Sequence, residues 1–584
     1  MRSIGDRKGC KGWVSHSLAF VATMLVAGLQ FLFSPAWAGY ELPPGERITN
    51  LPHIPRSMPN KESYESYDPV IGRNFDIKNF WMRADLRVRP EFRNGVCFGG
   101  GPPTAGTCNT LGGARANTPA FANGGGQTKA ANDFYVQQWV RLGIGYDLSP
   151  DVNFYFEIID SATWGGNGNP NNAGNGGDAL NHNCAQGSVN AGQANNGGGC
   201  RLGVRAAYVL VRNLAGVQGL SMKAGRQYVI FGNHSLFGHF DWANTGYSHD
   251  GIMFQYSTKV FDSYLGWFRN SETDILQGQP VGSGGQNIAQ AGNGRPDGGS
   301  DVDMFIFYNQ LKTIPGMVFE PYYVLYLNQL PSGAANNNGL AAGVNGGTIG
   351  TPKQGNQVRH MIGQRSELRK GNWDAILETA WQTGRMGDPS AAAVNPQQRN
   401  LTINAWAFRS WLGYTVYEHK WKPRLAVNLD MASGDGRANC NTGTAAGQCR
   451  SANTFENFFP TNHIHMGYAD VQAWKNMVAP QLNFQARPSE RDHFEIWYMN
   501  MNLQSSKDCW YRAGQGCYTF SNSNNTKKHI GDEVDFSWTR MFADGNVALQ
   551  ATYAHIFTGG YLTANLPGSP SNQSWGFVQL WMNF

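Results

Sequence analysis

The dominant pattern along this chain is a two-residue alternation of apolar and polar side chains, repeated in runs between turn-forming residues. A period of two is the repeat of a β-strand whose two faces meet different surroundings. Met82, Ala84 and Leu86, for example, alternate with charged residues. Such runs predict eighteen strands, at residues 80–93, 134–148, 152–164, 203–213, 219–227, 249–257, 260–269, 301–311, 317–328, 357–368, 372–384, 400–415, 421–433, 474–488, 491–503, 528–541, 545–558 and 573–584. The chain is therefore expected to be all-β.

The connections between these strands alternate in length. Those after even-numbered strands are short, such as Ser149-Pro-Asp151 and Ala543-Asp-Gly545. Those after odd-numbered strands are long, including 94–133, 165–202 and 434–473. Bacterial outer-membrane barrels have short periplasmic turns and long external loops. The alternation predicts a transmembrane antiparallel β-barrel over residues 79–584, and a ring of this size encloses an aqueous channel.

The first 38 residues have the features of a cleaved signal peptide. Basic residues near the start precede an apolar run from Leu18 to Phe33, and Ala36-Trp-Ala38 is a cleavage-site pattern. A transmembrane anchor is the alternative, but the run is short for a membrane span and contains Gln30. Cleavage is the prediction.

Two further segments bear on location. Residues 39–78 are rich in proline and lack alternation, so we expect a periplasmic segment that precedes the barrel, with insertion into the pore or binding of a partner as alternatives. The last strand ends on Phe584, and an amphipathic strand closed by an aromatic residue resembles the assembly signal of bacterial outer-membrane proteins. The predicted location is the bacterial outer membrane, with its lipid against the outward strand faces.

Charge and composition are compatible with a barrel and add little to the prediction. Glycine accounts for 73 of the 584 residues and aromatic residues for 12%, which is compatible with a barrel whose membrane signal is spread over alternate positions. Removal of the signal peptide would take four basic residues and Asp6, leaving 42 basic against 40 acidic residues, a net charge of +2. Such a balance indicates no nucleic-acid partner.

Eight cysteines follow the signal peptide. They form four pairs of close neighbours in the sequence, one in each of the long connections after strands 1, 3, 13 and 15. An even set of cysteines in an exported chain is typical of disulfides. The predicted disulfide pairs are Cys97/Cys108, Cys184/Cys200, Cys440/Cys449 and Cys509/Cys517.

The alternation also separates a charged face from an apolar one. Basic side chains that face lipid near the membrane midplane cost about 2–4 kcal/mol each, so the charged face is predicted to line the channel. On the first strand this face carries Arg83, Asp85, Arg87, Arg89, Glu91 and Arg93. On later strands it carries Glu157, Glu320, Arg359 or Arg365, Glu378, Arg409, Arg424, Asp430, Arg487, Glu533 and Asp535. For each residue, structural ion pairing and solute contact both remain open.

Several segments resemble the alginate-export family of outer-membrane proteins. The segments that carry the resemblance are Lys223-Ala-Gly-Arg-Gln227, Asp241-Trp-Ala-Asn-Thr245, His249-Asp-Gly251, Trp373-Asp-Ala-Ile-Leu-Glu378, Ala432-Ser-Gly-Asp435 and Phe455-Glu-Asn-Phe-Phe-Pro-Thr-Asn-His463. The resemblance implies an eighteen-stranded barrel with an electropositive constriction that passes a polyuronate. Arg226 and the segment Asp241-Trp242 are then expected to shape an inward-folded constriction.

These observations predict passive, electrostatically selected passage of an anionic polysaccharide or of small anionic solutes. The planar guanidinium of arginine matches a carboxylate, and nearby acidic residues keep each binding site weak enough for conduction. Two alternatives remain open: a general porin for small solutes, and a structural sheath that docks a periplasmic or electron-transfer partner through residues 39–78. No catalytic, metal-binding or cofactor motif stands out, so neither an enzyme nor a cofactor is expected.

Overall fold

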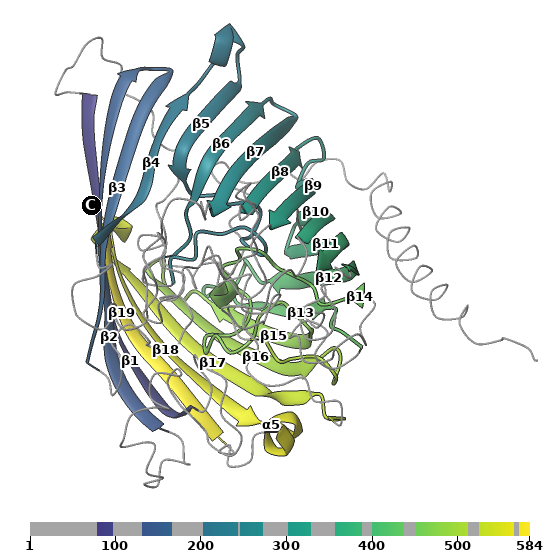
Figure 1. Cartoon of the computed structure of the whole chain (residues 1–584). Helices are drawn as coiled ribbons and strands as arrows, with labels where there is room; N and C mark the ends of the chain where they lie inside the picture. Colours follow the sequence, from purple (N-terminus) through teal and green to yellow (C-terminus); the bar gives the residue numbers. More distant parts are fainter. Residues whose placement is uncertain are drawn as a thin grey trace, which may run out of the picture. The chain divides into compact units, whose positions relative to one another are not determined.

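Eighteen antiparallel strands close into a ring in the computed structural model of this chain (Figure 1). Strand β1 (Phe80–Val96) pairs with β2 (Ala131–Ser149) on one side and with β19 (Asn572–Asn583) on the other, so the sheet has no free edge. A closed barrel satisfies every strand's backbone polar groups within lipid. The structure describes residues 79–96, 131–165, 202–242, 246–271, 302–328, 357–387, 400–436, 451–511, 525–565 and 572–583. The predicted signal peptide and the segment 39–78 lie outside these residues.

Every predicted strand is present, with ends within about three residues of the predicted ones. The remaining strands of the ring are β3 (Val152–Gly165), β4 (Leu202–Val211), β5 (Leu220–Gln227), β6 (His249–Ser257), β7 (Phe261–Ser271), β8 (Val302–Leu311), β9 (Met317–Asn328), β10 (Gln357–Lys370), β11 (Trp373–Gly387), β12 (Asn400–Thr415), β13 (Arg424–Ala432), β15 (Met477–Ala486), β16 (Asp492–Leu503), β17 (His529–Phe542) and β18 (Val547–Thr558). The two-residue strand β14 (Ser451–Ala452) stands outside the ring, because it pairs in parallel with β12 while β13 pairs directly with β15. The predicted all-β barrel is confirmed.

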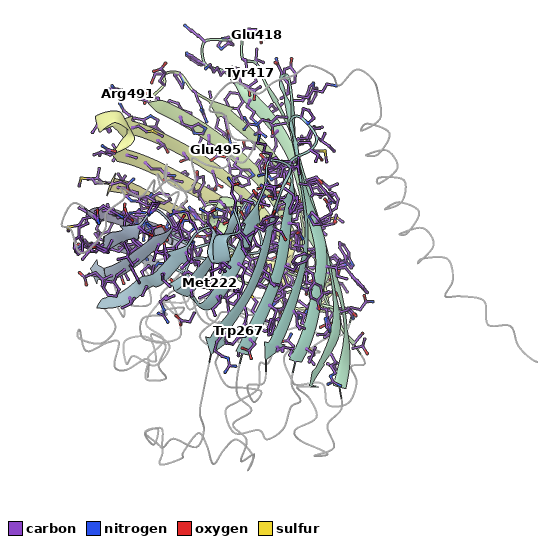
Figure 2. The ribbon with its side chains drawn as sticks, turned by 90° about the horizontal axis from the view of Figure 1, so that it is seen from above. Met222, Trp267, Tyr417, Glu418, Arg491 and Glu495 are labelled. Carbon is purple, nitrogen blue, oxygen red and sulfur yellow. The ribbon has the colours of Figure 1, made fainter. Side chains whose placement is uncertain are left out.

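The short turns gather at one end of the ring. Figure 2 shows Tyr417, Glu418 and Arg491 at that end and Trp267 toward the other. The turn between β8 and β9 requires glycine at Gly316, whose φ of 73° is left-handed and where a Cβ would lie 2.5 Å from a backbone carbonyl of β10. Since short turns of bacterial barrels are periplasmic, this end faces the periplasm.

The two faces of the wall differ as the alternation predicts. On β12 and β13 the outward Leu412 and Val427 are 48% and 52% exposed, whereas the inward Trp411 and Asn428 are buried. Large apolar side chains are exposed in the same way on most strands of the ring. So wide an apolar belt is rare on a protein in water, and it suits the lipid of the outer membrane.

Two connections leave the wall and run across the space that the strands enclose (Figure 1). The first lumen segment consists of residues 228–242 and 246–248, between β5 and β6. The second lumen segment consists of residues 451–476, between β13 and β15. Both contribute large apolar side chains to the main buried core, among them Phe237 and Phe240 from the first and Phe455 and Phe459 from the second. The centre of the ring is therefore packed with protein.

Helices are short in the described part of the chain. They comprise α5 (Gly560–Asn565) and single turns of 3₁₀-helix at η7 (Leu214–Gly216), η9 (Asn462–Ile464) and η10 (Ala543–Gly545). Within these ranges, none reaches the length and apolar character that a membrane-crossing helix needs. Helix η9 lies within the second lumen segment, where all three of its residues are buried.

Candidate channel constriction

The two lumen segments bind each other inside the ring. Phe237 of the first and Phe459 of the second form a parallel β-bridge. The Gly238 amide donates to the Phe459 carbonyl at 2.8 Å, and the Phe237 ring stacks on Phe458 with ring centroids 5.9 Å apart. The two segments therefore form a single constriction.

Asp241 ties the first lumen segment to the wall. Its carboxylate accepts hydrogen bonds from Arg141 on β2 and from Arg205 on β4, each at 2.8 Å. His239 lies 3.3 Å away. Burial raises the pKa of Asp241, but the charges of these three neighbours outweigh that effect and hold the pKa well below its usual value. The result is an ionised carboxylate clasped by two arginines from different strands.

Two arginines of β1 hold the backbone at the same point. Arg87 donates to the carbonyls of Asp241 and Trp242, the latter at 3.0 Å. Arg89 donates to the Trp242 carbonyl at 2.8 Å, and its guanidinium carbon lies 3.4 Å from the centre of the Trp242 ring. Both arginines are buried. The segment expected to shape a constriction, Asp241-Trp242, thus lies directly on the arginines of the first strand.

The other charged residues of β1 also have protein partners. Asp85 accepts from Arg83 at 2.7 Å and lies 3.3 Å from Arg141. Glu91 pairs with Arg89 at 2.6 Å. The side chain of Arg93 lies outside the described residues. On β3, Glu157 accepts from the hydroxyl groups of Tyr155 and Tyr228. This side of the wall is a network of opposite charges, with Arg83 partly exposed.

The opposite side of the wall holds the first lumen segment through Arg409. Its guanidinium pairs with Asp430 at 2.9 Å and donates to the Ser235 hydroxyl at 2.7 Å. Glu378, on the neighbouring strand β11, accepts from Tyr322 at 3.3 Å. Arginine therefore anchors the first lumen segment on both sides of the ring.

Further ion pairs on β9 to β13 join strand to strand. Arg365 on β10 pairs across the strands with Glu320 on β9 at 2.5 Å, and within its own strand with Glu367. Arg424 pairs with Asp374 through two hydrogen bonds of 2.7 and 2.8 Å. Such cross-strand pairs stabilise the wall, so these predicted channel-lining residues face inward but bind protein in this structure.

Carboxylates on β16 and β17 hold the second lumen segment. Glu533 accepts from the Ala469 amide at 2.9 Å, and Asp535 accepts from the Tyr468 amide at 3.1 Å. The Tyr468 hydroxyl in turn donates to Glu495 at 2.9 Å. The constriction is thus fixed by arginines on one part of the wall and by acidic residues on another.

Arg226 departs from its expected place in the constriction. The alternation of β5 buries the neighbouring Gln227, which donates to the carbonyls of Gly225 and Gly251. Arg226 therefore faces outward, where it makes two hydrogen bonds to Asp250, a side chain that is 52% exposed. The resemblance to the family motif led us to expect Arg226 in the constriction, but the pleat of β5 places its side chain on the outer face.

A pair of buried acids fixes the external end of the second segment. Asp435, after β13, and Asp508, after β16, both contact the Thr454 hydroxyl, at 3.2 and 2.5 Å. A hydroxyl has one hydrogen, so it can donate to only one of two carboxylates. The other contact requires a proton on a carboxyl. In accordance with this, burial and then the charge of Asp508 raise the pKa of Asp435 to about 8.

Sequence reasoning missed several of the anchors. Arg141 follows the same inward alternation as Trp139 and was detectable from it. Arg205 lies beside a register shift between β3 and β4, which the alternation does not reveal. Within the described ranges, no group of three or more His, Cys, Asp or Glu side chains is placed to hold a metal ion.

Only one of the eight cysteines in the predicted disulfides lies among the described residues. Cys509 is buried and disulfide-bonded. The other seven cysteines of the four predicted pairs lie outside the described residues: Cys97, Cys108, Cys184, Cys200, Cys440, Cys449 and Cys517. The structure therefore supports a disulfide at Cys509, while the pairing of each cysteine with its neighbour stays a prediction.

Comparison with known proteins gives one family. A model of the alginate-export family matches residues 173–577, more than half of the chain. No curated protein matches. Similar solved structures from Pseudomonas aeruginosa include OccK9 (OpdG), 11% identical, covering 87% of this chain and 99% of that one, with a TM-score of 0.45; OccK5 (OpdH), 10% identical, covering 86% and 98%, with a TM-score of 0.43; and the outer membrane protein OprD, 8% identical, covering 87% and 93%, with a TM-score of 0.44.

Proposed function

Because this chain belongs to the alginate-export family, whose members are β-barrels of the bacterial outer membrane, we propose that it is a passive channel that selects anionic solutes, with polysaccharides of sugar acids as the principal candidates. Selection is electrostatic, and no bond is made or broken. The observation that carries the proposal is the binding of one carboxylate by wall arginines at the constriction.

The site around Asp241 has the chemistry that a sugar carboxylate requires. Arg141 and Arg205 each place a nitrogen 2.8 Å from a different oxygen of Asp241. Guanidinium groups bind carboxylates in this way through directed, charge-assisted hydrogen bonds. A uronate ring carries the same carboxylate, so its carboxyl group can take the place of Asp241 when the first lumen segment moves aside.

Acidic residues beside the wall arginines weaken the binding of a permeating anion, as conduction requires. Asp85 lies 3.3 Å from Arg141, and Glu91 lies 2.6 Å from Arg89. A permeating ion must be bound firmly enough to enter and weakly enough to leave. An arginine whose charge is partly neutralised by a neighbouring acid binds the carboxylate of a solute weakly. The solute therefore leaves the site quickly and passes on.

A general porin for small solutes is the second candidate. The predicted mature chain carries 42 basic and 40 acidic residues, and the inward arginines Arg365, Arg409 and Arg424 each pair with an acidic residue. Such a balanced lumen favours modest ion selectivity with no preference for a polymer.

Ion selectivity distinguishes these candidates. The purified channel is inserted into a planar bilayer between unequal KCl concentrations, and the reversal potential is measured for the wild type and for Arg141→Gln. We expect anion preference in the wild type and a clear loss of it in the variant. Arg540→Gln is the matched control, because Arg540 is an exposed arginine that pairs with Asp492 at 3.0 Å on the outer face. A wild-type potential near zero would favour the general porin.

A barrel without current would point to the third possibility, a structural sheath. In that case we expect a pull-down from periplasmic extract to depend on residues 39–78. Current in the bilayer together with no bound partner would exclude the sheath.

A further inference from the structure

We propose that the external rim of the barrel carries a binding site for the phosphate group of an outer-leaflet lipid, formed by Lys527 and Lys528, the rim lysines. Both side chains are exposed, and they directly precede His529, the first residue of β17. The site lies outside the constriction, so this inference does not depend on the solute that the channel passes.

The rim lysines stand just above the apolar belt of the wall. The outward Phe542, 39% exposed, lies at the periplasmic end of β17, and Asp532 lies ten positions nearer the external end of the same strand. At about 3.4 Å per residue and a tilt of about 40°, this stretch rises about 26 Å. The apolar band of an outer-membrane barrel is about 25 Å tall. Asp532 therefore marks the external edge of the belt, and the rim lysines lie beyond it, at the level of the lipid headgroups.

A polar network on the outer face lies at this edge. The Asp532 carboxylate accepts hydrogen bonds from Tyr498 at 2.8 Å and from Asn500 at 2.6 Å, both on β16. His529, whose side chain is 41% exposed, lies 3.1 Å from the same carboxylate. The acid below the rim lysines thus has its own partners in the protein. Polar side chains gather on the outer wall where the belt ends, as an interface with lipid headgroups requires.

The backbone of the rim lysines is fixed to the neighbouring structure. The Lys528 carbonyl accepts a hydrogen bond from the amide of Leu503, the last residue of β16, at 2.9 Å. The buried side chain of Asn525 accepts from the Lys527 amide at 3.0 Å and donates to the Lys527 carbonyl at 2.9 Å. A site whose backbone is already held in place loses less conformational entropy when a ligand binds.

The ammonium groups keep hydrogens for a ligand. Lys528 donates to the Gln504 carbonyl at 2.7 Å, which uses one of the three hydrogens of its ammonium group. Within the described ranges, neither rim lysine forms an ion pair. The exposed Arg540, lower on the outer face of β17, instead pairs with Asp492 at 3.0 Å. Two adjacent cations at the headgroup level therefore lack a protein anion.

A lipid phosphate supplies that anion. Lysine binds phosphate as a compact point charge, and lysines near an anionic lipid surface each strengthen binding. The acyl chains of such a lipid lie against the apolar side chains below, among them Phe536 and Phe557, each 48% exposed. A solvated loop accounts for exposed lysines in general. It does not account for two lysines without an ion pair, on a fixed backbone, at the edge of the belt.

Native mass spectrometry of the full-length barrel in detergent tests the rim lysines. Diphosphoryl lipid A is titrated against the wild type and against the double variant Lys527→Gln/Lys528→Gln, and the Kd is obtained from the fraction of lipid-bound barrel. We expect the double variant to bind about five- to thirtyfold more weakly, since each lysine near an anionic lipid contributes about a fivefold factor. Dephosphorylated lipid A should bind both proteins equally and weakly.

Lys420→Gln/Lys422→Gln is the matched control, because both are exposed lysines in the periplasmic turn after β12. We expect it to bind diphosphoryl lipid A as the wild type does. Equal weakening in this control, equal affinity of the wild type for the two lipids, or no lipid binding at all would overturn the site. Displacement of the lipid by millimolar inorganic phosphate, at matched ionic strength, would overturn the assignment to a lipid in favour of a free ion. Unchanged single-channel conductance verifies that each variant is folded.

Discussion

Arg205 on β4 and Asp241 in the first lumen segment are joined at 2.8 Å, although 36 residues separate them in the sequence. The same guanidinium donates to the carbonyl of Tyr247 at 2.5 Å and to that of His239 at 2.8 Å. One wall side chain therefore fixes the lumen segment at three points. The position of the constriction depends on a few such contacts.

Asp241→Asn is expected to release the first lumen segment. The substitution leaves two buried arginines without their carboxylate, and breaking a buried ion pair from one side costs about 3–5 kcal/mol. We expect single-channel conductance to rise and to become noisier, because the segment no longer stays on the wall. Asp250→Asn is the control, since that acid pairs with Arg226 on the outer face. Equal conductance in Asp241→Asn and wild type would contradict this role.

Gly467→Ala is expected to loosen the second lumen segment. Gly467 has a φ of 83°, and a Cβ there would collide with the Glu533 carboxylate, which accepts the Ala469 amide at 2.9 Å. Backbone strain of this kind costs about 1–3 kcal/mol. Hydrogen exchange of the Ala469 amide should accelerate. Gly436→Ala, where a Cβ meets open space, should leave it unchanged, and acceleration of equal size in both variants would argue against the contact.

The buried acids make the external end of the constriction sensitive to pH. The pKa of Asp435 is raised to about 8 by burial and by Asp508, so the folded protein keeps a proton that the unfolded chain loses above about pH 4. The stabilisation from this proton is complete below that pH and is lost as the pH rises toward 8. Thermal unfolding between pH 5 and 9 should show the decline in the wild type.

Two amide variants separate the roles of these acids. In Asp435→Asn the amide group can donate to Thr454 in place of the proton, so we expect the pH dependence to flatten with little loss of stability. Asp508 accepts four hydrogen bonds, from the Asp435 and Cys509 amides and the Thr454 and Tyr511 hydroxyls. An amide nitrogen facing two of these donors should destabilise Asp508→Asn at every pH. Equal behaviour of the two variants would refute the shared proton.

The sequence was sufficient to predict the wall of the barrel. Alternation located each strand, and the lengths of the connections gave the direction of the ring, because both follow from which side of a strand meets lipid. The same reasoning placed Arg87, Arg409 and Glu533 on the inner face. It erred for Arg226, which was taken from a motif and not from the pleat of β5.

The contents of the lumen were harder to predict. A charged inward side chain has the same sequence pattern whether it meets water or a folded segment, so alternation did not show that Arg89 lies under Trp242. The first lumen segment has no periodicity, and its contacts with the wall depend on side chains such as Arg205 and Asp241 that are distant in sequence. Such long-range pairing is set by the closed ring and not by local propensity.

The most direct test of the proposed channel is single-channel current through the purified wild-type barrel, with and without oligouronate, and with a neutral oligosaccharide of equal length for comparison. We expect anion-preferring current that oligouronate interrupts at micromolar to millimolar concentration while the neutral sugar does not. We also expect Asp241→Asn to lengthen each interruption, since the polymer no longer competes with the chain's own carboxylate for Arg141 and Arg205. Steady current that neither sugar affects would contradict selective passage and leave a general porin.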